Sequence, residues 1–384
     1  MAFYIFWLSF GLMVYVYVGY PALLWLVSIF APSRKPSPTT DLTLTLLITA
    51  HNEEANLEAK LLNSLQLDYP REKLQILVVS DGSTDATDSI VERYRNHGVD
   101  FVRIPVQSGK THAQNVAVLS ATGEVIIFSD ATTEYRKDAL SLIAGNFVEP
   151  AIGAISGRYL YLSAGAASSM ASGAKAYAGY DNTVRHLQSK VGSITGCCGC
   201  IYAVRRELYT VLAADLISDL VQPLHVLKRG SRVVFEPRAV ASEYSTSSAG
   251  KEFHMRVRVV ARALRGILSV RELLLPWKFP WISIQLFSHK LLRWCIPVFL
   301  LSMFVASTLL STQPFYRSVL ILQVLFYALA AITYKFPLHR HWRPLSVPLY
   351  FCTVNAAAAF AVLQVIRGQQ YTIWRPERMD QNEV

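Results

Sequence analysis

Four long stretches of the chain contain no charged side chain. They cover residues 1–33, 294–316, 318–334 and 344–366. A helix needs about 20 apolar residues to cross the hydrocarbon core of a bilayer, and about 17 is near the lower limit. We therefore predict one membrane span at the N-terminus and about three near the C-terminus. The first stretch lacks a basic leader region and a clear cleavage site, which favours an anchor over a removed signal peptide.

Between the spans, short apolar runs alternate with stretches that favour helices. The runs predict strands at 42–50, 74–79, 101–104 and 124–128, with helices at 53–65, 84–96 and 109–120. Such alternation indicates a mostly parallel sheet with helices on both faces. Glu53, Asp81 and Asp130 follow three of these strands, at the edge where open α/β sheets bind ligands.

The pattern after residue 150 is less regular. Strands are predicted at 151–162, 201–204 and 232–237, the last extended by 239–243, and helices from about 169 to 190, after Arg205 and over the basic stretch 253–270. Residues 273–287 contain Trp277 and Trp281 and predict a segment that lies in the membrane interface.

Composition agrees with a membrane protein. Of the 384 residues 52% are hydrophobic, and the mean hydropathy of +0.29 is too high for an ordinary soluble enzyme. The net charge is +10, and much of the excess lies in 251–293, where it suits an anionic leaflet. Because these basic residues flank spans, we expect no nucleic-acid partner. The five cysteines form no paired framework and no zinc-finger spacing, which fits a reducing compartment.

Charge also predicts orientation. Arg34 and Lys35 directly follow the first span, so this end should face the cytoplasm. The predicted layout is an N-terminal span (1–32), a cytosolic domain (33–250), basic interfacial helices (251–290), about three spans (291–366) and a tail (367–384). We expect a multi-pass protein of the plasma (inner) membrane. The tail carries three arginines yet would lie outside, so either it is exported or one C-terminal segment is re-entrant.

Seven motifs occur in order between residues 44 and 266. They read AHNEE, VVSDGSTD, GKTHAQN, FSDAT, TGCCGC, ISD and RALRG. This set resembles the family 2 glycosyltransferases, in particular the membrane-embedded branch that contains cellulose, hyaluronan and poly-N-acetylglucosamine synthases. The resemblance implies an α/β domain with the Rossmann-like GT-A fold, about four transmembrane helices, interfacial amphipathic helices and a nucleotide-sugar donor.

The resemblance implies that Asp81 contacts the nucleotide base and that Glu53 supports the same pocket. A carboxylate that accepts from a base N–H would be a sensible specificity device. The alternative for Asp81 is a turn aspartate that caps the next helix. The alternative for Glu53 is an acid favoured by the dipole of a helix first turn, and Asp85 fits that alternative better than it fits catalysis.

The resemblance also implies a divalent ion at Asp130, either Mg²⁺ or Mn²⁺, that bridges the donor diphosphate. Thr132 stands where the family has its second acid, so this chain offers a weaker neutral ligand there. Asp130 could instead be a simple strand-end turn residue. Lys110 could neutralise donor phosphate, or be a solvated surface lysine.

Asp219 occupies the position of the family's catalytic base, which takes the proton from the acceptor hydroxyl. Ser218 replaces the acid that precedes it in the family, and Asp215 is the competing candidate. Cys198 and Gly199 resemble the family's acceptor-binding segment. A thiol nucleophile is the rival interpretation, but no helper histidine is evident from the spacing.

Residues 262–266 align with the Gln-x-x-Arg-Trp motif of processive synthases. Arg265 is retained and, with Arg262 in place of the glutamine, would bind the donor diphosphate through its planar guanidinium. Gly266 replaces the tryptophan, which argues against a long-chain synthase. Alternatively, these arginines belong to a basic helix on anionic lipid.

The sequence therefore predicts a membrane-bound inverting glycosyltransferase of cell-surface polysaccharide assembly. The donor would be a nucleotide sugar, UDP-linked, and the acceptor lipid-linked or a glycan, with membrane lipids and other polysaccharide-assembly proteins as further partners. Two alternatives stay open, a processive synthase that exports its polymer and a catalytically inactive membrane scaffold. A transporter is disfavoured because the spans hold few ionisable residues.

Overall fold

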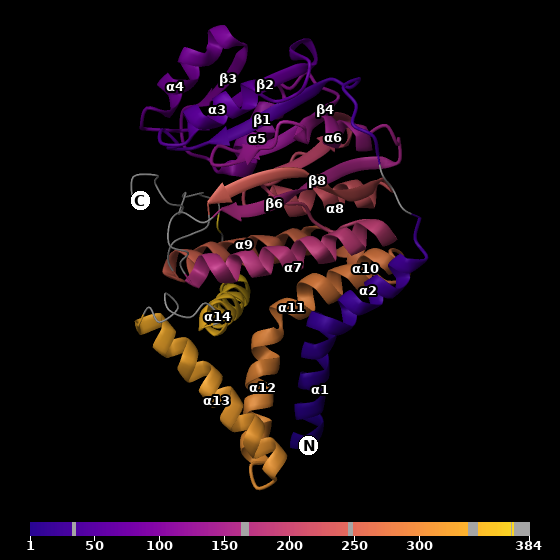
Figure 1. Cartoon of the computed structure of the whole chain (residues 1–384), viewed down its shortest axis with the longest axis vertical. Helices are drawn as coiled ribbons and strands as arrows, with labels where there is room; N and C mark the ends of the chain where they lie inside the picture. The colour runs from indigo at the N-terminus through magenta and orange to yellow at the C-terminus, as the bar shows by residue number, and fades with distance from the viewer. Residues whose placement is uncertain (33–35, 163–168, 245–248, 337–344, 370, 372–384) are drawn as a thin grey trace.

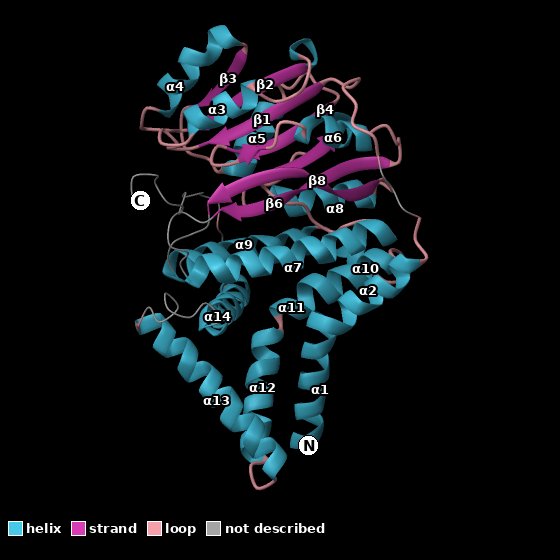
Figure 2. Cartoon of the chain, in the orientation of Figure 1, coloured by secondary structure: helices cyan, strands magenta, loops and turns pink. Residues whose placement is uncertain are grey.

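The structure is a computed structural model that describes all residues except 33–35, 163–168, 245–248, 337–344, 370 and 372–384. A sheet flanked by helices forms one end of the molecule, and two long helices, α7 (Ser169–Val191) and α9 (Ala249–Ser269), run beneath it (Figure 1). Further helices extend away from this layer toward the opposite end. Figure 2 shows that strands are confined to the sheet end.

Within the described residues, the strands form one eight-stranded sheet in the order β3-β2-β1-β4-β7-β6-β8-β5. Their bounds are β1 Leu44–Ala50, β2 Leu74–Asp81, β3 Val99–Ile104, β4 Val125–Asp130, β5 Glu134–Tyr135, β6 Ile152–Leu162, β7 Ile201–Arg205 and β8 Arg232–Tyr244. The first four strands are parallel, as predicted. β7 is antiparallel to β4 and β6, whereas β8 runs parallel to β6 and antiparallel to β5. The sheet is therefore mixed.

The apolar runs of the central strands bury both faces of the sheet. Leu46 and Ile48 of β1 point into one hydrophobic cluster, while Leu47 between them points into the other. Leu77 and Val79 of β2 likewise face the second cluster. Side chains alternate across a strand, so a continuous apolar run is what a sheet covered on both faces requires.

Helices from alternating βα units supply the two covers. Against the first cluster pack α3 (Leu57–Leu65), α4 (Thr87–Tyr94) and α6 (Ala139–Asn146), and against the second pack α5 (Lys110–Val118), α8 (Ser218–Lys228) and α9. Short 3₁₀ turns occupy Arg71–Lys73, Arg95–His97, Arg206–Leu208 and Arg271–Leu274. The helix predicted after Arg205 is thus only one turn, and α6, α8 and β5 were not predicted as elements.

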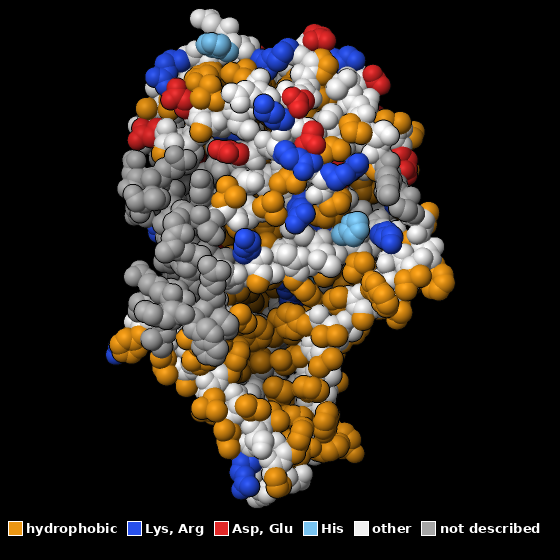
Figure 3. Space-filling model, viewed as in Figure 1, with side chains coloured by type: hydrophobic (Ala, Val, Ile, Leu, Met, Phe, Trp, Pro, Cys, Tyr) orange, Lys and Arg blue, Asp and Glu red, His pale blue; other side chains and the backbone are white. Residues whose placement is uncertain are grey.

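Among the described residues, three helical segments are long and apolar enough to cross a membrane by length and composition. They are Ala2–Ile29 (α1 Ala2–Val14, a π-turn Tyr15–Gly19 and α2 Tyr20–Ile29), α13 (Pro314–Lys335) and α14 (Ser346–Ile366). A fourth arises if Pro280–Trp294 and α12 (Ile296–Leu309), which meet at a bend of 56°, count as one. The segment Pro280–Trp294 comprises α10 (Pro280–Leu286), a π-turn (Phe287–Leu291) and α11 (Leu292–Trp294). Hydrophobic side chains gather on this end of the molecule and charged ones around the sheet (Figure 3).

The predicted boundary between the second and third spans differs from the structure. The uncharged stretch 294–316 was expected to be one span, but its helix α12 ends at Leu309 and α13 begins at Pro314. Proline is favoured at the first turn of a helix, where its missing N–H is not needed. The predicted span 318–334 is therefore too short. The helix that contains it, α13, also includes Arg317 and is 22 residues long. The predicted tail lies largely outside the described residues.

Candidate active site

The carboxyl ends of β1 and β4 open onto a cavity of about 820 Å³. Its walls come from distant parts of the chain, namely the segment 52–56, Asp85, Lys110, Asp130, Thr132, the loop 197–200, Asp219, Glu243, Arg258 and Arg262. Seven residues proposed from the sequence therefore meet here, because parallel strands end at one edge of the sheet and α8 and α9 close the opposite side. They are Glu53, Lys110, Asp130, Cys198, Gly199, Asp219 and Arg262.

Asp219 lies in the first turn of α8, with its carboxyl group in the cavity wall. Its Oδ1 is buried and has no hydrogen-bond partner within the described residues. Burial raises the pKa of this carboxyl above its ordinary value, and Asp130 raises it further, although Lys110 and Arg185 oppose the shift. An unpaired carboxylate oxygen with a raised pKa is suited to accept a proton. Asp215 precedes the helix and does not line the cavity.

The loop that contains Cys198 and Gly199 packs directly on Asp219. The backbone N–H of Cys197 donates to the Asp219 carbonyl at 2.8 Å. A Cβ placed on Gly199 would lie 2.8 Å from Asp219 Oδ2, which is too close for any side chain. Cys198 Sγ lies 3.1 Å from Cys200 Sγ, and the Cys198 N–H donates to Ser156 Oγ at 3.0 Å. Glycine at 199 thus gives the carboxyl group the space that it occupies.

Asp130 ends β4 and forms an ion pair with Lys110, the first residue of α5. Thr132 lies two residues further on and donates to Glu243 Oε1 of β8 at 2.9 Å. No cluster of three or more His, Cys, Asp or Glu side chains suited to a metal occurs in the described part of the chain. A Mg²⁺-like ion commonly uses only one or two protein carboxylates and takes its other ligands from substrate phosphates and water. Asp130, Thr132 and Glu243 each present an oxygen atom to this cavity, which is the donor chemistry that a shared site of this kind uses.

Glu53 and Asp85 organise the segment between β1 and β2. Glu53 is buried, its Oε2 accepts from Asn56 Nδ2 at 2.9 Å, and its N–H donates to Thr87 Oγ1 at 2.8 Å. Asp85 accepts from the N–H of Thr87 at 3.0 Å, at the start of α4, and from the N–H of Glu54 at 3.1 Å. Asp85 therefore has the helix-start contact that the sequence suggested for it, while both acids also line the cavity.

Asp81 is fully buried and does not line the cavity. Its two carboxylate oxygens accept from the N–H groups of Ser108 and Gly109, both at 2.8 Å. Gly109 has a φ of +96°, a backbone conformation that favours glycine. In this structure Asp81 anchors the loop that leads into α5, so its assignment as the base-binding acid stays a prediction.

The two arginines of the RALRG motif have different surroundings. Arg262 is buried and donates to the carbonyl of Asp215 at 3.2 Å and to Thr111 Oγ1 at 3.0 Å, so it fastens the loop before α8. Burial lowers the pKa of Arg262 to about 10. Arg265 pairs with Asp215 Oδ2 at 2.9 Å and does not line the cavity. Arg262 is therefore better placed than Arg265 to contact a nucleotide sugar in the cavity.

Several cavity residues were not proposed from the sequence. Tyr159 and Arg185 come from β6 and α7, where no motif marks them, and Glu243 lies near the end of β8. Arg258 lies within the predicted basic helix 253–270 and also lines the cavity. Its spacing of four residues from Arg262 places both on one face of α9, a signal that could have pointed to the cavity.

Comparison with known proteins agrees with this fold. Residues 45–212 match the family model described as glycosyl transferase family 2. A solved mannosyltransferase of Pyrobaculum calidifontis, PcManGT in complex with GDP-Man and Mn²⁺, superposes with a TM-score of 0.71 at 21% identity, over 95% of this chain and 99% of that one. The fold is thus that of the GT-A glycosyltransferases, as the sequence predicted.

Curated relatives have the same kind of name. An N-acetylglucosaminyltransferase of Mesorhizobium japonicum is 26% identical over 258 residues, covering 63% of this chain and 60% of the relative. A poly-beta-1,6-N-acetyl-D-glucosamine synthase of Staphylococcus aureus is 24% identical over 238 residues, covering 60% of this chain and 57% of the relative. The chain thus matches somewhat over half the length of these proteins. Residues 45–212 therefore resemble family 2 glycosyltransferases, and the relatives that the chain matches are named as glycosyltransferases.

Proposed function

We propose that this protein is a membrane-bound inverting glycosyltransferase that acts in cell-surface polysaccharide assembly. It would transfer one sugar from a UDP-linked donor to a lipid-linked or glycan acceptor at the cytoplasmic side of the plasma membrane. The observation that carries the proposal is the placement of Asp130 and Asp219 in one cavity of about 820 Å³. A strand-end carboxylate for the donor side and an unpaired buried carboxylate for the acceptor side are the two groups that such a transfer needs.

In the proposed reaction, Asp219 Oδ1 removes the proton from the acceptor hydroxyl as that oxygen attacks the anomeric carbon of the donor sugar. The new glycosidic C–O bond forms while the C–O bond to the diphosphate breaks, and its electron pair leaves with the nucleotide diphosphate. A single displacement inverts the anomeric centre. The raised pKa of Asp219 makes it a stronger base than an exposed aspartate.

A divalent ion, Mg²⁺ or Mn²⁺, would be held by Asp130 with Thr132 and Glu243 nearby, and it would supply charge stabilisation for the leaving diphosphate. Lys110 would move its ammonium group from Asp130 to a phosphate oxygen when the donor binds. Arg262 and Arg258 line the same cavity and would add positive charge on the α9 side. The Mn²⁺ present in the P. calidifontis enzyme supports the choice of ion.

The packing of Gly266 supports addition of single sugars rather than processive synthesis. A Cβ at this position would lie 2.5 Å from Val221 Cγ2 of α8, so the motif's tryptophan does not fit between α8 and α9 as they pack here. The names of the curated relatives favour an N-acetylhexosamine as the sugar. A processive synthase remains the runner-up because one of those relatives makes a polymer by name.

The test is donor turnover by the full chain in lipid. The protein is incubated with UDP-N-acetylglucosamine, other UDP-sugars and GDP-mannose, each with Mn²⁺, Mg²⁺ or chelator, and nucleotide release and product length are measured. We expect UDP release from one UDP-sugar, dependent on the ion, and products one sugar longer than the acceptor. Release from no donor would overturn the proposed function, and long polymer made from donor alone would overturn single addition.

A further inference from the structure

A second cavity, of about 340 Å³, adjoins the first on the side of the candidate spans. Asp219, Arg185, Tyr159 and Cys197 line both cavities, so the two are separated by little more than these side chains. The remaining walls come from α7, α9 and α14, from Tyr17 of the first candidate span, and from the segment 289–294. This membrane-side cavity thus connects the candidate base with the apolar end of the molecule.

The walls of the membrane-side cavity combine positive charge with apolar surface. Within the part of the chain that the structure describes, four cationic side chains line it, Arg185, Arg256, Lys290 and Arg293, against two carboxylates, Asp181 and Asp219. Toward α14 the lining is aromatic and aliphatic, with Tyr350, Phe351, Val354 and Ala358. A site with this composition suits a ligand with an anionic head and an apolar chain.

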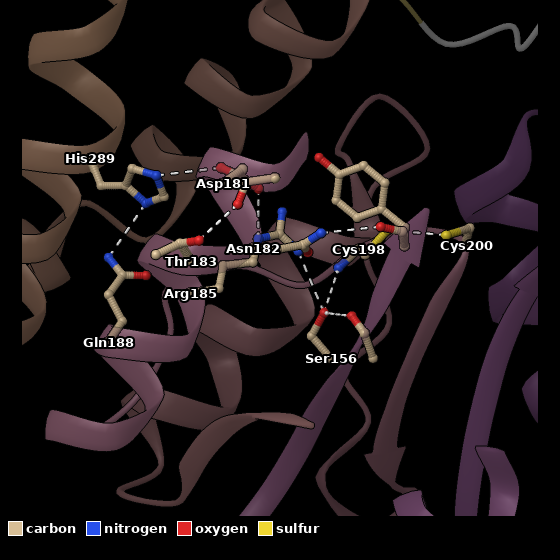
Figure 4. A network of polar contacts seen from close by, with 12 residues as sticks. Ser156, Asp181, Asn182, Thr183, Arg185, Gln188, Cys198, Cys200 and His289 are labelled. Carbon is tan, nitrogen blue, oxygen red and sulfur yellow. Dashed lines mark hydrogen bonds and ion pairs between the residues drawn. The ribbon is translucent and has the colours of Figure 1, made fainter. Parts of the chain in front are cut away.

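Three of these cations already have a carboxylate partner. Asp181 pairs with Arg185 at 2.8 Å, with His289 at 3.4 Å and with Arg293 at 3.6 Å (Figure 4 shows Asp181 with Arg185 and His289). Arg256 pairs with Glu252 at 2.8 Å and donates to the Tyr350 hydroxyl at 2.7 Å. One buried carboxylate therefore serves two arginines and a histidine.

Lys290 is different, since its Nζ makes no ion pair or hydrogen bond among the residues that the structure describes. It projects beneath the loop that holds Cys198, where a Cβ on Gly196 would lie 3.8 Å from Nζ. Asp181 and Asp219 act on this partly buried ammonium only from a distance, and an anion in direct contact would stabilise it further. Its position places such an anion beside the candidate base.

We propose that the membrane-side cavity binds the phosphate of a lipid-linked acceptor, with Lys290 as its main contact and the lipid chain against α14. This assignment rests on the proposed function, because it takes Asp219 as the base that meets the acceptor hydroxyl. The lipid enters from the membrane side while the nucleotide sugar occupies the larger cavity, so the two substrates meet at Asp219. The acceptor is then a phosphate-bearing lipid rather than a free glycan.

Lipid retention by the full-length protein in detergent tests the proposal. Native mass spectrometry compares phosphatidic acid with diacylglycerol of the same chains, for wild type, Lys290→Gln, Lys290→Arg and the surface control Lys278→Gln. A hydrogen bond to a charged group contributes about 1.5–3 kcal/mol, so Lys290→Gln should lower the affinity for phosphatidic acid by at least about tenfold. Lys290→Arg and Lys278→Gln should resemble wild type, and diacylglycerol retention should be low and unchanged in every variant.

Two outcomes would overturn the assignment. One is Lys290→Gln retaining phosphatidic acid as well as wild type does, and the other is inorganic phosphate displacing the lipid at equal concentration, which would indicate a free-anion site. UDP binding, measured on the same samples, should be the same in wild type and Lys290→Gln. If wild type retains the lipid through Lys290 but turns over no donor, the proposed function fails while the lipid site stands.

Discussion

Asp219 has two properties of a general base that follow from its position. Its Oδ1 lacks a partner within the described residues, and its carboxyl group is buried beside Asp130. Burial and the neighbouring negative charge both disfavour the ionised form and raise its pKa. The helix dipole acts in the opposite direction on this pKa, because it favours a carboxylate in the first turn of α8.

The raised pKa predicts the acid limb of the rate profile. The base must be ionised to work, so kcat/KM should fall as the pH falls through the pKa of Asp219. Because that pKa lies above its usual value of about 3.9, the limb should lie at higher pH than an exposed aspartate would give. Rates of UDP release across the pH range measure it. A profile that stays flat down to the ordinary aspartate range would contradict this account.

Asp130 should control ion affinity. Loss of an outer partner of a metal ligand already weakens binding about 10–100-fold, so Asp130→Asn should weaken Mn²⁺ binding in the presence of UDP by at least about tenfold. Electron paramagnetic resonance of free Mn²⁺ reports this without any turnover. Glu134→Gln, at an exposed position on β5, the next strand along the chain, is the matched control. Equal Mn²⁺ affinity in Asp130→Asn and wild type would remove Asp130 from the ion site.

The acidic residues at the strand ends could be predicted from the sequence, but the directions in which their side chains point could not. Glu53 and Asp130 reach the cavity as expected, whereas Asp81 turns toward the amides of Ser108 and Gly109. Those amides belong to a loop 27 and 28 residues further along the chain. Such long-range hydrogen bonds leave no local pattern. The same is true of the pairing of Arg265 with Asp215.

At the scale of elements, the loop 197–200 and the first turn of α8 act as one unit. Gly199→Ala would bring a Cβ to within 2.8 Å of Asp219 Oδ2, so loop or carboxyl group must shift. A misplacement of about 1 Å can cost about 10²-fold in rate, and we expect a loss of that order in transfer with UDP binding unchanged. Gly179→Ala on α7, where a Cβ meets nothing within 4 Å, is the control. Full transfer by Gly199→Ala would show that the loop does not position the base.

The contact between α8 and α9 gives a second prediction. Gly266→Trp would force a large side chain against Val221, and overpacking of this kind costs about 1–3 kcal/mol or more. Thermal unfolding in detergent should show a lower Tm than that of Leu268→Trp, which places the same ring at an exposed position of α9. A Gly266→Trp protein with wild-type stability that made long polymer would instead support the processive alternative.

Elements with strong periodicity were predicted well. The four parallel strands came from apolar runs, and α9 from its basic amphipathic pattern. Short elements such as β5 form because they pair with a distant strand, here β8. The local sequence does not predict such pairing. The division between α12 and α13 was missed because the loop around Pro314 contains no charge, so hydropathy alone continued the span.

At the scale of the whole molecule, the GT-A fold followed from the order of the motifs, but the meeting of two cavities at Asp219 did not. That meeting requires α7, α9 and α14 to pack together. Gly173 of α7 allows part of this contact, because a Cβ there would lie 2.6 Å from the Tyr350 ring of α14. A packed helical layer of α7, α9 and α14 therefore lies between the sheet and the other candidate spans.

The most direct test is transfer by Asp219→Asn in the full chain, embedded in lipid with the UDP-sugar and ion that the wild type uses. Removal of a general base lowers rates about 10²–10⁴-fold, so we predict a loss in this range with UDP binding intact. Asp215→Asn, at the neighbouring acid that does not line the cavity, should retain most of the transfer. Wild-type transfer by Asp219→Asn, or a comparable loss in Asp215→Asn alone, would contradict the account.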